Sequence, residues 1–334
     1  MVNKGLLTFQ TKPSLLQTAV TAGPLEELSP FSKSFDHIYT DERAEQQTNE
    51  QGHRQMTEDA VHLLLQKEQL TPEQIDYYLT GDLVNQMTPS NFSASALQIP
   101  YIGLFSACAT SISSLLTAAL LIEANAATYA IAGAASQHNA IERQFRYPVE
   151  YGTQKADTAQ WTATAAGVAL VSTKQKDKPL ITKGTIGRVI DMGMTDPLHM
   201  GAAMAPAAAD TLQRHLAGHQ MTPDSYDLIM TGDLGKVGFS IYEQLNEQNG
   251  IQKGRQFQDA GIAFYGGDEQ FLAGASGAGC SAAIYFSDVY EKLLSGRYQK
   301  VLLIATGALL SPLSYQQGET IPCIAHAVEL SMKE

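Results

Sequence analysis

A motif from the first half of the chain returns in the second half. Residues 70–83 read LTPEQIDYYLTGDL and residues 221–234 read MTPDSYDLIMTGDL, so the copies are 151 positions apart (221 − 70). Each copy is followed by a cysteine that opens an apolar segment, Cys108 in FSACATSISSLL and Cys280 in GASGAGCSAAIY. A strand-like run, ATYAIAGAAS or KVLLIATGALLSP, comes after each cysteine segment. The shared order of these features predicts a duplicated chain.

Helices alternate with short apolar strands in both copies. This pattern predicts an α/β fold with buried central helices between covered mixed sheets. We divide the chain into residues 1–175 and residues 176–334, because two parts of about 150 residues match the usual domain size. Residues 112–135 are the nearest thing to a membrane span, but Glu123 and Asn125 interrupt them and Ala and Ser dilute them. They predict a buried helix followed by a buried strand rather than a membrane span.

Other segments carry weaker signals. Residues 1–49 are polar and rich in turn residues, which favours irregular structure. Residues 167–172 and 180–189 resemble a pair of strands that closes the first half. Residues 138–161 form a connection, and residues 260–265 (AGIAFY) are predicted to be a strand of the second half.

The charge of the chain limits its partners. It has 22 Lys and Arg against 34 Asp and Glu, a net charge of −12 over 334 residues, and no basic face is visible. Nucleic acid is therefore not expected as a partner. The N-terminal stretch lacks the apolar core and small-residue cleavage site of a secretory signal, so we expect no signal peptide.

Metal and cofactor sites are not indicated either. The three cysteines lack C-x-x-C spacing, which gives neither a disulfide framework nor a zinc site. His215 and His219 stand at i, i+4, but Gly218 and the helix end favour solvated side chains over a metal site. We expect no metal and no cofactor.

Cys108 is the strongest candidate for chemistry. It lies where a short strand, residues 101–105, meets the first turn of a buried helix. The free N–H groups and the positive dipole end of that helix would stabilise a thiolate or a bound carboxylate. The position predicts that Cys108 is a nucleophile or part of an anion-binding turn. The remaining interpretation is that Cys108 is only a small residue of the core.

Several long runs resemble a known family. The ACAT turn at Cys108, the GASGAG run and the duplicated halves are similar to the thiolase superfamily of condensing enzymes. More closely, the runs TGDLVNQ, FSACATS, ERQFRYPVEYG, MTDPLHMGAAMAPAAADT and IPCIAHA resemble the stage V sporulation protein AD family, thiolase-like proteins of spore-forming bacteria. The resemblance covers the chain from about Asp82 to its end. It implies binding of dipicolinic acid (pyridine-2,6-dicarboxylate).

The same resemblance implies partners and a location. The chain would act with the other proteins of the stage V sporulation A operon, peripheral at the inner membrane of the developing spore, to take up dipicolinic acid. Thiolase relatives also pair through a strand near the reactive cysteine, which implies a homodimer.

The chain departs from the catalytic pattern of the superfamily. Relatives carry His or Asn three residues before the first Gly of the GASG-like run, where this chain has Phe271. They carry another His or Asn in the stretch that here reads Thr231-Gly232-Asp233. A second catalytic cysteine is missing from Leu303–Leu310. Because such groups contribute ~10²-fold to 10⁴-fold each, we expect a non-catalytic binding protein.

Dipicolinate is a flat dianion, so its pocket needs donors at two ends and an apolar slot between them. The helix start at Cys108 and Thr110 would hold one carboxylate through backbone N–H groups. Arg143 or Arg146 would hold the other by a two-pronged contact. The alternative is that these arginines pair with nearby glutamates, Glu142 and Glu150.

Three more residues are candidates for the ligand site. Ser136 and His138 follow the carboxyl end of a predicted strand, where ligands collect in α/β folds. Phe271 would form a wall of the slot. Asp82 and Asp233, in the two matching turns, are expected instead to hold the strand ends by side chain to backbone bonds.

A different function class remains open. Cys108 would act covalently if the chain were an acyltransferase or thioesterase of the superfamily. A structural scaffold that only shares the fold would neither react at Cys108 nor bind dipicolinate.

Overall fold

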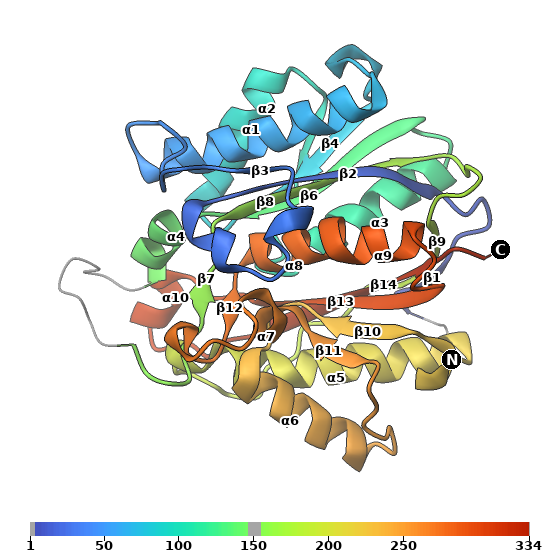
Figure 1. The fold of residues 1–334 in the computed structure, drawn as a ribbon. Coiled ribbons are helices and arrows are strands. Elements are labelled where there is room, and N and C mark those ends of the chain that lie inside the picture. The colour runs from blue at the N-terminus through green and yellow to red at the C-terminus, as the bar shows by residue number, and fades with distance from the viewer. Residues whose placement is uncertain (1–3, 146–154, 334) are drawn as a thin grey trace.

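Two stretches of five strands form the framework of the molecule (Figure 1). The structure is a computed structural model that describes residues 4–145 and 155–333. The first stretch runs, in spatial order, β5 (Tyr101–Gly103), β4 (Tyr77–Thr80), β6 (Tyr129–Ser136), β8 (Ala165–Ser172) and β2 (Ser14–Ala22). The second runs β11 (Phe257–Asp259), β10 (Leu228–Thr231), β13 (Lys300–Ala308), β14 (Cys323–Ser331) and β9 (Leu180–Thr185). They meet at one residue pair, Ser14 with Leu180.

The two stretches have the same topology. β4 is parallel to both its neighbours, and β6, β8 and β2 follow in antiparallel pairs. β10 is likewise parallel to both its neighbours, and β13, β14 and β9 follow in antiparallel pairs. The repeated sequence motif gives each of β4 and β10 the same entry, a single 3-10 turn with Thr71 or Thr222 as N-cap and a proline behind it.

Helices fill the layers on both sides of these sheets (Figure 1). The outer layers are α1 (Asn49–Glu68) and α2 (Thr88–Leu97) on the first sheet, and α5 (Met200–His219) and α6 (Gly235–Gln248) on the second. The central layer holds α3 (Thr110–Glu123), α8 (Ala278–Ile284) and α9 (Tyr290–Leu294). In this layer the hydroxyls of Ser111 and Ser281 hydrogen-bond at 2.8 Å. The predicted α/β fold of two duplicated halves, with buried central helices between the sheets, is confirmed.

Short elements complete the fold. β1 (Leu6–Thr8) pairs with β9, β3 (His37–Ile38) pairs with β2, and β7 (Trp161–Thr162) pairs with β12 (Ala275–Ser276). The remaining α-helices are α4 (His138–Phe145), α7 (Ala260–Phe264) and α10 (Pro312–Gln316). β7 and β12 bring a segment of each half together, and they lie beside the pocket described below.

Several predictions on secondary structure hold. α3 and β6 confirm the buried helix and buried strand expected in residues 112–135. None of the helices in residues 4–145 and 155–333 combines the length and the apolar character that a membrane crossing requires. The proposed division between residues 175 and 176 falls in the loop between β8 and β9.

Three predictions are wrong. The strand expected at residues 260–265 is instead helix α7 over Ala260–Phe264, because Asp259 caps the helix by accepting from the Ile262 N–H. Residues 1–49 are not irregular, since β2 is a buried nine-residue strand. Residues 167–172 and 180–189 contain strands as predicted, β8 and β9, but they do not both close the first half, because β9 pairs with β14 in the second stretch.

The predicted solvation of His215 is also wrong. Its ring is fully buried and bonds to Thr185 at 2.9 Å and to the Tyr226 hydroxyl at 3.0 Å. Burial lowers the pKa of His215 to about 3, so the ring is neutral. His215 therefore belongs to the packing of the second half.

Candidate functional site

Cys108 sits in a tight turn between β5 and α3. Ala107 has a φ of 49°, in the left-handed region that residues with a Cβ seldom adopt. Thr110 bridges the turn, because its Oγ1 donates to the Ala107 carbonyl at 2.7 Å and accepts from the Ser106 N–H at 3.2 Å. The Thr110 side chain is fully buried. It holds the turn in shape, and its hydroxyl is already occupied by the backbone.

A glycine from the second half lets this turn approach closely. A Cβ on Gly307 of β13 would lie 2.4 Å from the Ser106 carbonyl oxygen and 3.1 Å from the Ala107 Cβ. Only a residue without a side chain fits there. The position of Cys108 thus depends on contact between the two halves.

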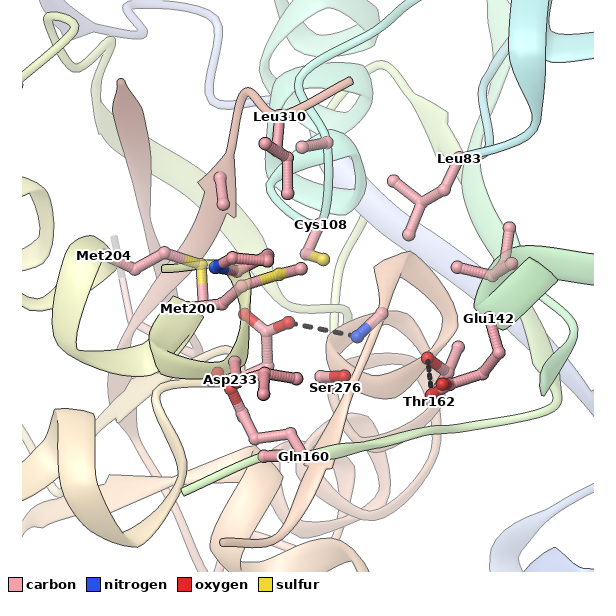
Figure 2. Close-up of a pocket in the computed structure, with 17 residues that line it drawn as sticks. Leu83, Cys108, Glu142, Gln160, Thr162, Met200, Met204, Asp233, Ser276 and Leu310 are labelled. Carbon is pink, nitrogen blue, oxygen red and sulfur yellow. Dashed lines mark hydrogen bonds between the residues drawn. The ribbon is translucent and has the colours of Figure 1, made fainter. Parts of the chain in front are cut away.

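A small pocket opens beside the Cys108 thiol (Figure 2). Its volume is about 80 Å³. Its apolar lining residues are Leu83, Ala107, Ile141, Ala159, Pro197, Leu198, Met200, Met204, Gly277, Ala308 and Leu310. Its polar lining residues are Cys108, Glu142, Gln160, Thr162, Asp233 and Ser276. No arginine, lysine or histidine belongs to this lining in the part of the chain that the structure describes.

Asp233 is a buried carboxyl group in the pocket wall. One of its oxygens accepts from the Thr306 hydroxyl at 2.7 Å, and the other accepts from the Gly277 N–H at 3.0 Å (Figure 2). Burial raises the pKa of Asp233 to about 7, although these two bonds and one from the Cys108 thiol lower it. Near neutral pH a substantial share of Asp233 is therefore protonated.

The loop that carries Asp233 is fixed by a second carboxyl, Asp259. Asp259 accepts from the N–H groups of Leu234 and Gly235, at 2.9 and 3.0 Å, and from the Thr231 hydroxyl at 2.7 Å. The Gln160 amide donates to the Asp233 carbonyl oxygen at 2.7 Å. Asp233 is thus held in one orientation, which suits a binding group.

The Cys108 thiol is poorly suited to act as a thiolate. Burial raises the pKa of Cys108 well above its usual value, and the nearby Asp233 carboxyl raises it further by its charge and by accepting a hydrogen bond from the thiol. The Gly277 N–H acts in the opposite direction but does not reverse the shift. Cys108 is consequently a neutral thiol in this structure.

The other side of the pocket holds Glu142. Its Oε1 accepts from the Thr162 hydroxyl at 3.1 Å (Figure 2) and from the Lys155 ammonium at 3.2 Å. Lys155 also lies 4.1 Å from the centroid of the Trp161 ring. The charge of Glu142 is therefore balanced by Lys155, so this end of the pocket is not strongly acidic.

The structure places two predicted site residues, Ser136 and His138, outside the pocket lining. The Ser136 hydroxyl donates to the Ala163 carbonyl at 2.7 Å and accepts from the Gly279 N–H at 3.0 Å. The His138 ring stacks on Trp161 with centroids 4.2 Å apart, and its Nδ1 bonds to the Thr162 carbonyl at 2.9 Å. Both residues connect elements that surround the pocket.

The predicted arginine contact is not found at Arg143. This side chain is exposed and pairs with Glu50 on α1. Arg143 therefore makes an ion pair, as the alternative expected, but with Glu50 in place of Glu142. Glu150 and Arg146 lie outside the described residues.

Phe271 is part of an aromatic stack and is not among the lining residues. Its ring stacks on Tyr265 with centroids 3.6 Å apart and meets Trp161 edge to face at 5.8 Å. It is almost fully buried, so it supports Trp161 from behind instead of forming the pocket wall.

Sequence reasoning did not place Asp233, Glu142, Gln160, Met200 and Met204 in the lining of the pocket. A signal existed for Asp233, because it stands in the stretch where relatives of the thiolase type place a catalytic His or Asn. As predicted, Asp82 holds a strand end, since its carboxyl accepts from the Val84 and Ser90 N–H groups. Asp233 does the same through Gly277, but it also faces the pocket.

Metal binding has no support from side-chain clustering. Within the described ranges, His, Cys, Asp and Glu nowhere gather in groups of three that would hold a metal ion. The chemistry of the pocket therefore has to be argued from its own thiol, carboxyl, amide and hydroxyl groups.

The fold of this chain is similar to that of several solved structures. Solved structures with a similar fold include 3-oxoacyl-[acyl-carrier-protein] synthase III from Aquifex aeolicus (15% identity, TM-score 0.58, covering 96% of this chain and 99% of that one). Cerulenin-bound OleA of Xanthomonas campestris (14%, TM-score 0.64, 97% and 98%) and human mitochondrial 3-ketoacyl-CoA thiolase (10%, TM-score 0.60, 96% and 99%) are also similar. At these identities they show the fold alone.

Sequence comparison is more specific. Residues 3–331 match the family described as Stage V sporulation protein AD. Stage V sporulation protein AD of Bacillus subtilis (strain 168) is 44% identical over 317 residues, which are 95% of this chain and 94% of that protein. The chain therefore belongs to the stage V sporulation protein AD family, within the thiolase fold.

Proposed function

We propose that this protein binds dipicolinic acid in the pocket beside Cys108, without catalysis, as part of the system that loads the developing spore. Membership of the family supports a role in sporulation. The thiolase fold is shared with enzymes, so the absence of catalysis has to be argued from the site itself.

The observation that carries the proposal is the buried, partly protonated Asp233 in a small apolar slot. A carboxylic acid in such a slot can donate a hydrogen bond to a carboxylate of the ligand. The apolar side chains of Met200 and Met204 suit the faces of a flat ring. Ser276 adds a hydroxyl to the lining. Thr162 and Gln160 add no free donor, because the Thr162 hydroxyl donates to Glu142 and the Gln160 amide donates to the carbonyl oxygens of Asp233 and Ala275. The ligand would thus meet neutral donors, Asp233 and Ser276, instead of the arginine that the sequence suggested.

Two features argue against catalysis. Cys108 is a neutral thiol, and the described lining has no histidine that would take up its proton. A nucleophile without an activating base and prepared oxyanion donors loses most of its rate. The Gly277 N–H, which points into the same region, is already bonded to Asp233.

The alternative function is covalent acyl transfer or thioester hydrolysis at Cys108. One observation favours it: the thiol sits on a turn with left-handed backbone at Ala107 and opens a central helix, as a nucleophile would. In that case Asp233 would serve as the base. Mass spectrometry after incubation with acetyl-CoA separates the two functions, because only the alternative predicts an acyl adduct on Cys108 and repeated turnover.

Partners and assembly belong to the same proposal. The protein would work peripherally at the inner spore membrane with the other products of the stage V sporulation A operon, and it would form a homodimer. The edge strand β5 and the exposed rings of Phe92 (56% exposed) and Phe105 (52%) support a two-fold contact on that side.

The decisive experiment is a calorimetric titration with dipicolinate at several pH values. Because a protonated Asp233 donates to the ligand, affinity should fall as the pH rises through about 7, up to tenfold per pH unit above it. Asp233→Asn should bind with little pH dependence in this range. Asp82→Asn, in the matching motif of the other half, is the control and should behave like the wild type. Absence of dipicolinate binding by the wild type would end the proposal.

A further inference from the structure

A second hollow, far from the Cys108 pocket, gathers lysine side chains. It has a volume of about 590 Å³ and lies among the segments that begin or end β1, β9, β13 and β14. Lys12, Lys183, Lys300 and Lys333 line it. In Figure 1, β1 and β9 lie at the opposite end of the molecule from α4, β7 and β12, which surround the first pocket. We call this site the lysine hollow.

The carboxylates of the lysine hollow offset only half of its positive charge. Glu329 is almost fully buried and is occupied by Lys183 at 2.9 Å and by the hydroxyls of Thr182 and Tyr226 at 2.6 and 2.8 Å. Asp227 accepts from the backbone N–H groups of Gln299 and Lys300.

Lys12, Lys300 and Lys333 have no carboxylate partner among the described residues. With four lysines against two carboxylates, the lining carries a formal charge of +2 (4 − 2) on a chain of net charge −12. Lys12 and Lys300 are also half-buried, so their charges act in a partly desolvated space.

The donor set selects among anions. The described lining contains no arginine, and a planar carboxylate is best held by the fork of an arginine. Lysine ammonium groups act as compact point charges, and with the hydroxyls of Thr8 and Ser225 they suit a tetrahedral oxyanion. The volume exceeds that of one such group and leaves room for the molecule that carries it.

We propose that the lysine hollow is a binding site for a phosphate-bearing ligand, separate from the Cys108 pocket. The phosphate would lie between Lys12, Lys300 and Lys333, and the rest of the ligand would extend over the polar lining. A free phosphate compound and an anionic lipid headgroup share this chemistry, and the test distinguishes them.

The first measurement is calorimetric titration of the full chain with inorganic pyrophosphate at low ionic strength, where charge attraction is least screened. The double variant Lys12→Gln/Lys300→Gln should raise the Kd about 30-fold or more, because it removes two charged donors. Lys12→Arg/Lys300→Arg should retain most of the affinity.

The control is Lys236→Gln/Lys253→Gln, which removes the same charge outside the lysine hollow and should leave the Kd unchanged. Unfolding midpoints of all variants establish that each is folded. The proposal is overturned if the wild type binds neither pyrophosphate nor the anionic vesicles described next. It is also overturned if the control variant loses as much affinity as the test variant.

The second measurement uses phosphatidylcholine vesicles with and without phosphatidylglycerol. Binding to the anionic vesicles that the Lys12→Gln/Lys300→Gln variant loses identifies a lipid headgroup, whereas pyrophosphate binding alone identifies a free phosphate compound. Dipicolinate titrations of the lysine variant and of Asp233→Asn distinguish a failure of this inference from a failure of the proposed function. Loss of dipicolinate binding in the lysine variant, with none in Asp233→Asn, would assign the hollow to dipicolinate and overturn the inference.

Discussion

Replacing Asp233 by asparagine should change how the stability of the protein depends on pH. Burial raises the pKa of Asp233 from 3.8 to about 7 in the folded protein. A carboxyl with a raised pKa contributes its full stability below the unfolded value, near pH 4, and this is lost as the pH rises through about 7. An asparagine has the same shape, and its carbonyl oxygen can still accept from the Gly277 N–H.

The magnitude follows from the shift. One pKa unit corresponds to about 1.4 kcal/mol, so the ionised carboxyl costs roughly 4 kcal/mol in the folded state well above pH 7. Between pH 5 and pH 8 the wild type should lose about 3 kcal/mol of its free energy of unfolding through this one group. Asp233→Asn should not show that loss, so its stability relative to the wild type should increase by about the same amount.

Urea denaturation followed by far-UV circular dichroism at pH 5 and pH 8 measures this difference. Glu26 is a useful comparison, because burial also raises its pKa to about 7. Glu26→Gln should remove a similar decrease of the free energy of unfolding with rising pH, independently of Asp233. If wild type and Asp233→Asn lose stability in parallel, Asp233 is already ionised at pH 5 and the argument for a carboxylic acid in the pocket collapses.

Four further predictions concern single positions and assembly. Cys108→Ala should weaken dipicolinate binding by only ~1 kcal/mol in a titration, since it removes one weak bond and some packing. Arg143→Ala should leave that affinity unchanged and cost less than about 1 kcal/mol of unfolding free energy in urea denaturation, because its ion pair is exposed. A large loss of affinity would instead place helix α4, which carries Arg143, in the ligand site. Gly307→Ala should displace the Cys108 turn and reduce dipicolinate affinity at least about tenfold, as its Cβ would meet the Ser106 carbonyl at 2.4 Å. Light scattering should report a dimer near 72 kDa (2 × 36.0), and a monomer at micromolar concentration would contradict the assembly proposed.

The fold was predictable because the same motifs occur in the same order in both halves of the sequence. The TGDL motifs mark equivalent strand ends, and the segments at Cys108 and Cys280 open the two central helices. β2 escaped detection because both its faces are buried in the sheet, so no alternation of polar and apolar residues marks it. Helix α7 escaped because its five residues are too few for a helical period to show.

The pocket was harder to predict than the fold. Cys108 could be found from its position at a helix start, and the departures from the thiolase pattern at Asp233 could be read from the sequence. The role of Arg143 could not, because its distance from Glu50 on α1 depends on how α4 packs. Met200 and Met204 come from a helix that looks like ordinary core, and only the meeting of the two halves brings them to Cys108.

The sole tryptophan of the chain gives the pocket its own optical signal. Trp161 stands between Gln160 and Thr162, which both line the pocket, and its ring lies between His138, Lys155 and Phe271. Its indole N–H is buried and has no hydrogen-bond partner among the described residues. Any ligand that shifts Glu142 or Thr162 would move the charge of Lys155 relative to the indole. The intrinsic fluorescence of the unmodified protein should therefore report occupancy of this one pocket, free of background from other tryptophans.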